Sequence, residues 1–274
     1  MITIVFGKPG AGKTAFLVAD AVKYMNFSED CRTLYASCCD EVKSLNAAGA
    51  CYSLPLSAPV YSNFPISVSC GVRSSVESYY IDGFHLGFEN EDVPVMPVLP
   101  ESRIYLSEAQ RYYNSRRSKD LPDWVSRFYE EHRHFGLNIM LDVQRPGLID
   151  INIREICERF VEVRELEHKT DAAGNITATI FHYREFEDWT LVENYLSTGE
   201  KCYAEQKTRF DGNVFDCYTS RSYFSQFLPR TDFSLIPHLH GDGQEDVELA
   251  KMMYQQTPPE GFYGAKKRRI KDEV

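Results

Sequence analysis

Short apolar runs alternate with helix-forming segments along most of the chain, and this alternation predicts an α/β fold. Residues 1–6 form an apolar, β-branched run that is typical of a buried strand, and residues 15–22 favour a helix. Further strands are expected at residues 33–36, 103–106, 137–143, 159–163 and 177–183, and a further helix is expected at residues 123–134. Strands separated by helices predict a mostly parallel central sheet that helices cover on both faces.

Prolines and charges divide the chain near residue 235. Residues 46–75 are rich in Ser, Pro and small residues, which favours strands and loops. The prolines of residues 93–100 exclude a helix or a central strand, so this segment is expected to be a linker. Residues 245–256 favour a short helix, and the basic sequence KKRRIKDEV follows. We therefore expect one large domain at residues 1–235 and a separate C-terminal unit at residues 236–274.

Composition limits the function classes. The net charge of the 274 residues is −10, so the surface as a whole does not indicate a nucleic-acid-binding protein, and any such contact must be a local patch. The eight cysteines are scattered without a C-x-x-C pair, which predicts reduced thiols in a cytosol rather than a disulfide framework. The sequence has no run of 18 apolar residues and no secretory signal, so neither a membrane-spanning helix nor export is expected.

The first chemical motif is GKPGAGKT, which matches the phosphate-loop pattern G-x-x-x-x-G-K-[ST]. It lies between a predicted strand and a predicted helix, where backbone N–H groups and the helix N-terminus attract phosphates. Lys13 is expected to reach the β- and γ-phosphates of ATP, and the Thr14 hydroxyl is expected to hold Mg²⁺. The predicted nucleotide contacts are Gly7, Lys8, Pro9, Gly10, Ala11, Gly12, Lys13, Thr14 and Ala15. The alternative is an ordinary Gly-rich turn.

The second motif is RIYLSEAQ, an apolar strand that ends in a carboxylate. In a phosphate-loop ATPase we expect such a strand beside the loop strand, ending in Asp-Glu. Glu108 is then the residue that polarises the attacking water, and Ser107 occupies the position of the Asp. A serine can bond a Mg²⁺-bound water but supplies no charge, so we expect weakened metal binding. Alternatively, Ser107 and Gln110 form a capping box at the start of a helix.

Longer segments resemble a known family. LSEAQRYYNSR and WVSRFYEEHRHFGLNIMLDVQRPGLIDINIRE, together with the phosphate loop and more weakly VFDCYTSRSYFS, resemble the zonular occludens toxin-like family, the assembly ATPases of filamentous phages. The resemblance covers roughly residues 1–230. Two features depart from the family: Ser107 stands where the family usually has Asp, and no membrane span follows the ATPase domain.

The resemblance implies both an activity and partners. It implies an ATPase with a RecA/FtsK–HerA-like fold that forms a homo-oligomeric ring, a hexamer or a pentamer. Such a motor exports single-stranded phage DNA through the host envelope while coat subunits assemble on it. The implied partners are the phage coat and envelope assembly proteins. The implied location is the host cytoplasm, at the cytoplasmic face of the inner membrane.

Further residues are candidates for the reaction. Gln144 follows a predicted strand, where a polar side chain can touch the γ-phosphate and the attacking water; the alternative is a surface turn residue. Arg133, Arg154 and Arg159 are candidates for an arginine finger that acts on a neighbouring subunit, and Arg159 is favoured because it opens a strand. The alternative for each arginine is a structural ion pair.

Two basic regions are candidates for binding anionic partners. Tyrosines and Trp124 are interleaved with arginines between residues 103 and 133, as in a groove that neutralises phosphates and stacks bases of single-stranded DNA. The alternative is a solvated helix face. The basic cluster at residues 266–271 is attracted to anionic lipid, at about 1 kcal/mol per charge, or is a solubilising tail.

Three function classes remain after this reasoning. The first is the motor ATPase of phage assembly. The second is a nucleotide-binding assembly scaffold that has lost hydrolysis, which Ser107 favours. The third is a small-molecule kinase, which also uses a phosphate loop; Glu108 and Gln144 count against it, since a kinase needs no residue that polarises water.

Overall fold

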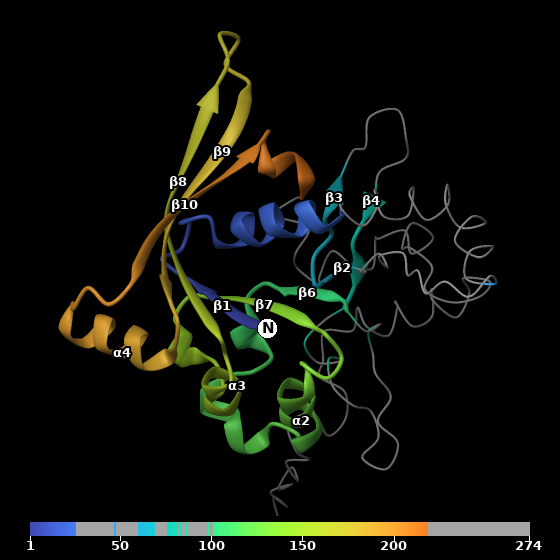
Figure 1. The fold of residues 1–274 in the computed structure, drawn as a ribbon, viewed down its shortest axis with the longest axis vertical. Helices are drawn as coiled ribbons and strands as arrows, with labels where there is room; N and C mark the ends of the chain where they lie inside the picture. Colours follow the sequence, from blue (N-terminus) through green and yellow to red (C-terminus); the bar gives the residue numbers. More distant parts are fainter. Residues whose placement is uncertain are drawn as a thin grey trace, which may run out of the picture.

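An eight-stranded sheet forms the centre of the described chain (Figure 1). The computed structural model describes residues 1–25, 60–68, 76–81 and 101–218, with Ala47, Gly83, Leu86 and Val98. The strands are β1 (Ile2–Phe6), β2 (Val60–Ser62), β5 (Tyr79–Tyr80), β6 (Arg103–Leu106), β7 (Asn138–Val143), β8 (Arg159–Thr170), β9 (Ile176–Phe186) and β10 (Ala204–Asp211), in the order β10-β9-β8-β1-β7-β6-β2-β5. Two short strands, β3 (Ser67–Val68) and β4 (Val76–Glu77), pair separately.

The pairing directions confirm a mostly parallel sheet. The pairs β8–β1, β1–β7, β7–β6, β6–β2 and β2–β5 are parallel, while β8–β9 and β9–β10 are antiparallel. Figure 1 shows β8 and β9 projecting as a long ribbon beyond the rest of the sheet. The predicted strand at residues 33–36 and the predicted C-terminal unit at residues 236–274 lie outside the described residues.

One predicted neighbour in the sheet is wrong. The strand of the RIYLSEAQ motif, β6, does not lie beside β1, because β7 lies between them. Consecutive strands usually lie side by side, and β6 pairs with β7 in register from Arg103–Asn138 to Leu106–Leu141. On this side of the sheet, the strand that pairs with β1 is therefore β7.

Helices cover both faces of the sheet, as predicted. Residues 13–25 are helical and pack on one face with apolar side chains of β1, β6, β7 and β8. The other face carries α2 (Asp123–Glu131), α3 (Ile151–Glu155) and α4 (Trp189–Thr198). The described residues also contain short 3₁₀ turns: η1 (Ala109–Arg111), η2 (Ser115–Asp120), η3 (Pro146–Leu148) and η4 (Val214–Cys217).

Alternation along β1 explains the two layers. Ile2, Ile4 and Phe6 belong to the core beneath α2 and α3, whereas Val5 belongs to the core beneath the helix of residues 13–25. Successive side chains of a strand point to opposite faces, so a strand buried on both faces is apolar at nearly every position, and Thr3 is the one polar residue of β1. Among the described residues, no helix has the length and apolar character needed to cross a bilayer.

Candidate nucleotide-binding site

The loop of residues 7–14 curls between β1 and the helix that follows. The backbone N–H of Ala11 donates to the carbonyl of Lys8 at 3.1 Å, which closes a turn. The N–H of Phe16 donates to the carbonyl of Gly12 at 2.8 Å, which begins the helical bonding. Because a helix leaves its first N–H groups without intrahelical acceptors, the first turn presents donors to the space inside this loop.

Strand β8 fixes both ends of the loop. A Cβ atom at Gly7 would lie 2.5 Å from the carbonyl oxygen of Val163, and one at Gly12 would lie 2.8 Å from Cδ1 of Leu166. Gly12 also has a φ of 93°, which side chains rarely allow. Close packing and backbone conformation therefore require glycine at Gly7 and Gly12, the two positions that the pattern G-x-x-x-x-G fixes.

Lys13 lies within the loop rather than in solvent. Its side chain is buried, and its Nζ donates to the carbonyl oxygen of Lys8 at 3.3 Å. The ammonium group thus bridges the loop from its helical end to its beginning. An ammonium in this place suits the predicted role of Lys13, which is to face bound phosphates.

A buried carboxylate, Asp142, joins the two motifs. The hydroxyl of Thr14 donates to Asp142 Oδ2 at 2.9 Å, and the hydroxyl of Ser107 donates to the same oxygen at 2.7 Å. The two hydroxyl oxygens lie 3.2 Å apart. The backbone N–H of Glu108 donates to Asp142 Oδ1 at 3.1 Å. The structure thus brings the predicted metal residues Thr14 and Ser107 together, with a carboxylate between them.

The alternation of β7 places Asp142 at this point. Leu141 and Val143 point into the core beneath α2 and α3, while Met140 points to the face of the phosphate-loop helix. Asp142 follows Met140 by two residues and pairs in register with Val5 of β1. Its carboxylate therefore lies on the helix face, at the edge where the loop leaves the sheet.

Sequence reasoning missed Asp142, although a signal was present. Asp142 is a charged residue near the carboxyl end of an otherwise apolar strand, NIMLDV, and it is 1% exposed. Burial raises the pKa of Asp142, and the hydrogen bonds from Ser107, Glu108 and Thr14 and the charge of Lys13 oppose this rise. A charged side chain in a buried strand calls for a partner, and here that partner lies in the loop motif.

Asn63, which follows β2, holds the end of β6. Its side-chain amide donates to the carbonyl oxygen of Ser107 at 2.9 Å and accepts from the Ser107 N–H at 2.8 Å. The same amide nitrogen donates to the Tyr112 hydroxyl at 3.1 Å. Asn63 therefore fixes the backbone from which Ser107 points at Asp142. No motif in the sequence singles out Asn63.

Glu108 adopts a left-handed conformation with a φ of 54°. For a residue other than glycine this conformation is strained, and such strain is concentrated at functional sites. Its half-buried side chain accepts a hydrogen bond from Gln110 Nε2. The alternative capping box is not formed, because the turn begins at Ala109 with Glu108 as its N-cap, and the Ser107 hydroxyl bonds Asp142 instead.

Gln144 lies one residue beyond the end of β7 and is exposed. By alternation it has the same parity as Asp142, so both leave β7 toward the face of the phosphate-loop helix. Its predicted contact with the γ-phosphate stays a prediction.

The three candidate finger arginines all have intramolecular partners. Arg159 pairs with Glu185 through Nε–Oε1 at 2.6 Å and Nη2–Oε2 at 3.1 Å. Arg159 is in register with Thr3, four residues before the loop begins, or about 13 Å along the strand. It lies too far along the sheet to serve the phosphate loop of its own subunit, so a role as a finger requires a neighbouring subunit.

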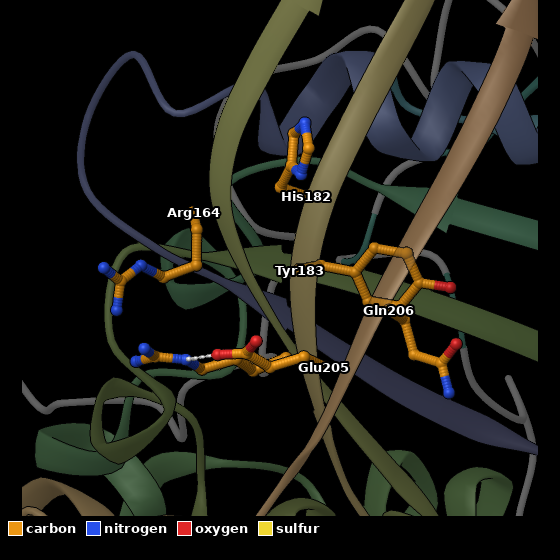
Figure 2. A pocket seen from close by; sticks show the side chains of 6 residues that line it. Arg164, His182, Tyr183, Glu205 and Gln206 are labelled. Atoms are coloured by element: carbon orange, nitrogen blue, oxygen red, sulfur yellow. Dashed lines mark ion pairs between the residues drawn. The ribbon is translucent and has the colours of Figure 1, made fainter.

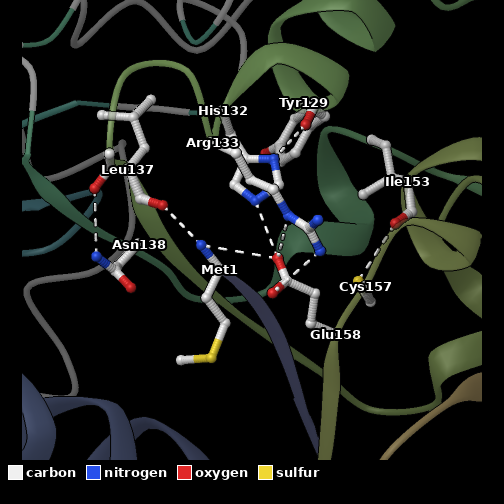
Figure 3. Close-up of polar contacts among 10 residues, drawn as sticks. Met1, Tyr129, His132, Arg133, Leu137, Asn138, Ile153, Cys157 and Glu158 are labelled. Atoms are coloured by element: carbon white, nitrogen blue, oxygen red, sulfur yellow. Dashed lines mark hydrogen bonds and ion pairs between the residues drawn. The ribbon is translucent and has the colours of Figure 1, made fainter.

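Arg133 and Arg154 are held in other ways. Figure 3 shows Glu158 accepting a hydrogen bond from Arg133 and lying beside the His132 ring and the amino group of Met1, which forms an ion pair with it at 3.8 Å. Burial alone would raise the pKa of Glu158, but the Arg133 guanidinium and the N-terminal ammonium hold it below its ordinary value. The guanidinium of Arg154 lies over the Trp189 ring, 4.3 Å from its centroid.

The predicted stacking groove for single-stranded DNA is wrong for its tyrosines. Tyr112, Tyr113 and Tyr129 are buried in the core beneath the sheet, and Tyr113 packs edge-on against Tyr129. Their rings complete the apolar face of α2 and η1, so they cannot stack on bases. Trp124 also packs partly against this core.

An open pocket of about 190 Å³ lies on the antiparallel part of the sheet, and none of the predicted site residues lines it. It is lined by Arg164, His182, Tyr183, Arg184, Glu205 and Gln206 (Figure 2). An ion pair of 3.8 Å joins Arg184 of β9 to Glu205 of β10 across it. Arg164 is the extra residue of a β-bulge and directly follows Val163, which contacts the phosphate loop.

The residues present fit a magnesium ion. Thr14 and Ser107 offer hydroxyl oxygens and Asp142 offers a carboxylate, within 3.2 Å of one another. Mg²⁺ prefers oxygen ligands and is usually bound by one or two carboxylates together with substrate phosphates. Ser107 alone provides no charge, and the carboxylate beside it does.

Comparison with known proteins supports the family resemblance. Residues 98–223 match the family model described as zonular occludens toxin (Zot). The N-terminal domain of zonular occludens toxin from Neisseria meningitidis aligns at 17% identity over 79% of this chain and 97% of that chain, with a TM-score of 0.45. No curated protein matches the sequence.

More distant alignments concern the genome packaging NTPase B204 from Sulfolobus turreted icosahedral virus 2. Its complex with ATP-gammaS aligns at 9% identity over 68% of this chain and 91% of that chain, with a TM-score of 0.30. Its complex with AMPPCP aligns at 9% identity over 77% and 97%, with a TM-score of 0.33. The family match begins after the phosphate loop, so the loop stands on its own sequence and geometry.

Proposed function

We propose that the protein is an ATP-hydrolysing motor of filamentous phage assembly. The proposal starts from the match of residues 98–223 to the Zot family model. The observation that carries the proposal is the bond between the phosphate-loop Thr14 and the buried Asp142 at the carboxyl edge of a parallel sheet. In open α/β sheets, ligands bind outside this edge, where loops leave the strands.

The site residues divide the work of hydrolysis. The N–H groups of the first helical turn and the Lys13 ammonium hold the phosphates of ATP. Glu108 orients and polarises the attacking water, because it follows the strand end that Asn63 and Asp142 fix. Thr14, Ser107 and Asp142 would hold Mg²⁺, which neutralises charge on the phosphates when bound.

The finer parts of the proposal rest on the family. We propose export of single-stranded phage DNA as coat subunits assemble, by a homo-oligomeric ring at the cytoplasmic face of the host inner membrane. Arg159 remains the proposed finger acting on a neighbouring subunit. With the stacking groove excluded, the DNA contact falls to side chains other than the buried tyrosines.

The scaffold alternative loses its main support. It was favoured because Ser107 brings no charge to the metal, and Asp142 places a carboxylate 2.7 Å from the Ser107 hydroxyl. A site with a lysine, a glutamate and this carboxylate has the groups that hydrolysis requires.

Lys13→Ala tests the phosphate loop. The substitution removes the charge that bridges the loop, so ATP affinity, measured by isothermal titration calorimetry, should fall below detection. Lys23→Ala is the matched control: it removes an exposed lysine of the helix that follows the loop, outside the predicted nucleotide contacts. Unchanged affinity in Lys13→Ala, or an equal loss in both variants, would refute a phosphate site built on Lys13.

A further inference from the structure

We propose that Asp142 of β7 provides the carboxylate toward Mg²⁺ that Ser107 lacks at the end of β6. The inference rests on the proposed function and makes it more specific. The carboxylate thus lies at the end of β7, one strand nearer to β1 than the end of β6. Ser107, at the end of β6, is its hydrogen-bond partner. Asp142 is in this sense a metal-site residue that the phosphate-loop motif does not include.

The contacts converge on one atom. Asp142 Oδ2 accepts from both Thr14 at 2.9 Å and Ser107 at 2.7 Å. Thr14 is the residue of the loop motif that binds Mg²⁺ through its hydroxyl. The carboxylate oxygen therefore already lies in hydrogen-bond contact with the hydroxyl that the motif assigns to the metal.

The environment of Asp142 calls for a cation. The side chain is 1% exposed, and its hydrogen-bond donors are two hydroxyls and one backbone N–H, all of them neutral. Removing a carboxylate from water without a full opposite charge is costly, so buried carboxylates are usually paired or bind metals. The Lys13 ammonium, which donates to the Lys8 carbonyl, offsets part of this cost through its charge. A divalent cation beside Thr14 would offset the remainder.

The strand order of the sheet allows a carboxylate at the end of β7 to take the place of one at the end of β6. Neighbouring strands lie about 4.8 Å apart, and β7 lies between β1 and β6. A carboxylate at the end of β7 on the helix face thus lies nearer to the loop strand than one at the end of β6. Asn63 holds the Ser107 backbone in place, so the hydroxyl of Ser107 stays directed at Asp142.

The test measures how strongly Mg²⁺ improves nucleotide binding. ADP affinity is titrated by calorimetry in MgCl₂ and in EDTA, for the wild type, Asp142→Asn and the double variant Ser107→Asp with Asp142→Ser. Asp142→Asn keeps the shape and the acceptor oxygen but removes the charge. Loss of a residue that orients metal ligands typically costs 10–100-fold in metal affinity, so the gain from Mg²⁺ should shrink by about 10-fold or more. In EDTA its affinity should match the wild type.

The double variant returns the carboxylate to the end of β6, so it should recover most of the gain from Mg²⁺. It also keeps the test decisive if Asp142→Asn fails to fold, since it restores the number of buried charges. An equal gain from Mg²⁺ in the wild type and Asp142→Asn, or no recovery in a folded double variant, would overturn the inference. A wild type that binds no ADP in either buffer would instead refute the proposed phosphate site itself.

Discussion

Glu108 is the residue on which hydrolysis, as distinct from binding, depends. It follows Ser107, whose backbone is held by Asn63. The backbone of Glu108 has a strained left-handed conformation, and its N–H donates to Asp142. Such a conformation aims the side chain away from the direction that a continuing strand would give it. The Glu108 side chain makes no capping hydrogen bond to the turn that follows, so helix capping does not account for the strained backbone at this position.

Glu108→Gln should separate binding from turnover. The substitution keeps the size of the side chain and removes the charge that polarises water, so ATP should bind normally while kcat falls about 10²-fold or more. Phosphate release measures the rate and calorimetry measures binding. Glu155→Gln, on the exposed side of α3, is the control and should keep full activity. A Glu108→Gln enzyme with wild-type turnover would leave Glu108 without a catalytic role.

Residue-level prediction succeeded where chemistry is local and failed where it depends on the fold. The phosphate loop was predicted from the spacing of its glycines, and the strand and helix beside it were predicted from their apolar and helix-forming residues. Asp142 and Asn63 were missed because their roles depend on which strands become neighbours. The stacking tyrosines were wrong because the sequence between residues 103 and 133 does not reveal which face of α2 and η1 the core buries.

At the scale of elements, β8 determines the shape of the phosphate loop. Its backbone closes on Gly7 and its Leu166 side chain closes on Gly12, so loop and strand form one packed unit. The strands β6 and β7 were predicted close to their observed positions, whereas β8 begins at the predicted residue but continues to Thr170, well beyond the predicted end at residue 163. Their order was not predicted, because the local pattern of an apolar strand does not state which strand it will pair with.

Gly7→Ala should destabilise the protein by more than the cost of backbone strain alone. A Cβ atom would lie 2.5 Å from the Val163 carbonyl oxygen, which is backbone and cannot rotate away. Gly174→Ala, at the tip of the β8–β9 ribbon, is the matched control, since it has a φ of 86° and open space around it. We expect Gly174→Ala to cost about 1–2 kcal/mol and Gly7→Ala to cost more, with loss of ATP binding. Urea unfolding measures both, and equal losses would argue against the close packing of β8 on the loop.

A single subunit does not supply an arginine finger to its own phosphate loop from Arg159. Arg159 lies toward the opposite edge of the sheet from the loop and is paired with Glu185, so in its own subunit it is a structural residue. An arginine finger supplied by a neighbour is worth roughly 10³–10⁵ in rate where it is used. If the motor forms a ring, each active site should depend on subunit contact.

Turnover per subunit should therefore rise with protein concentration, as followed by phosphate release together with light scattering. Arg159→Ala should abolish this rise, whereas Glu185→Gln, which breaks the same ion pair from the other side, should keep it. Equal effects of the two variants would assign Arg159 to the ion pair alone. Arg164, at the bulge beside the loop, would then be the next arginine to substitute.

The proposed function requires this chain to hydrolyse ATP at its phosphate loop and to couple that hydrolysis to the movement of single-stranded DNA. Steady-state ATP turnover with Mg²⁺, measured with and without single-stranded DNA, tests it most directly, with Lys13→Ala as the background. We predict turnover well above that background, abolished by EDTA and increased by single-stranded DNA. ATP binding with turnover no higher than that of Lys13→Ala, in both the presence and the absence of DNA, would contradict the account and leave a nucleotide-binding scaffold.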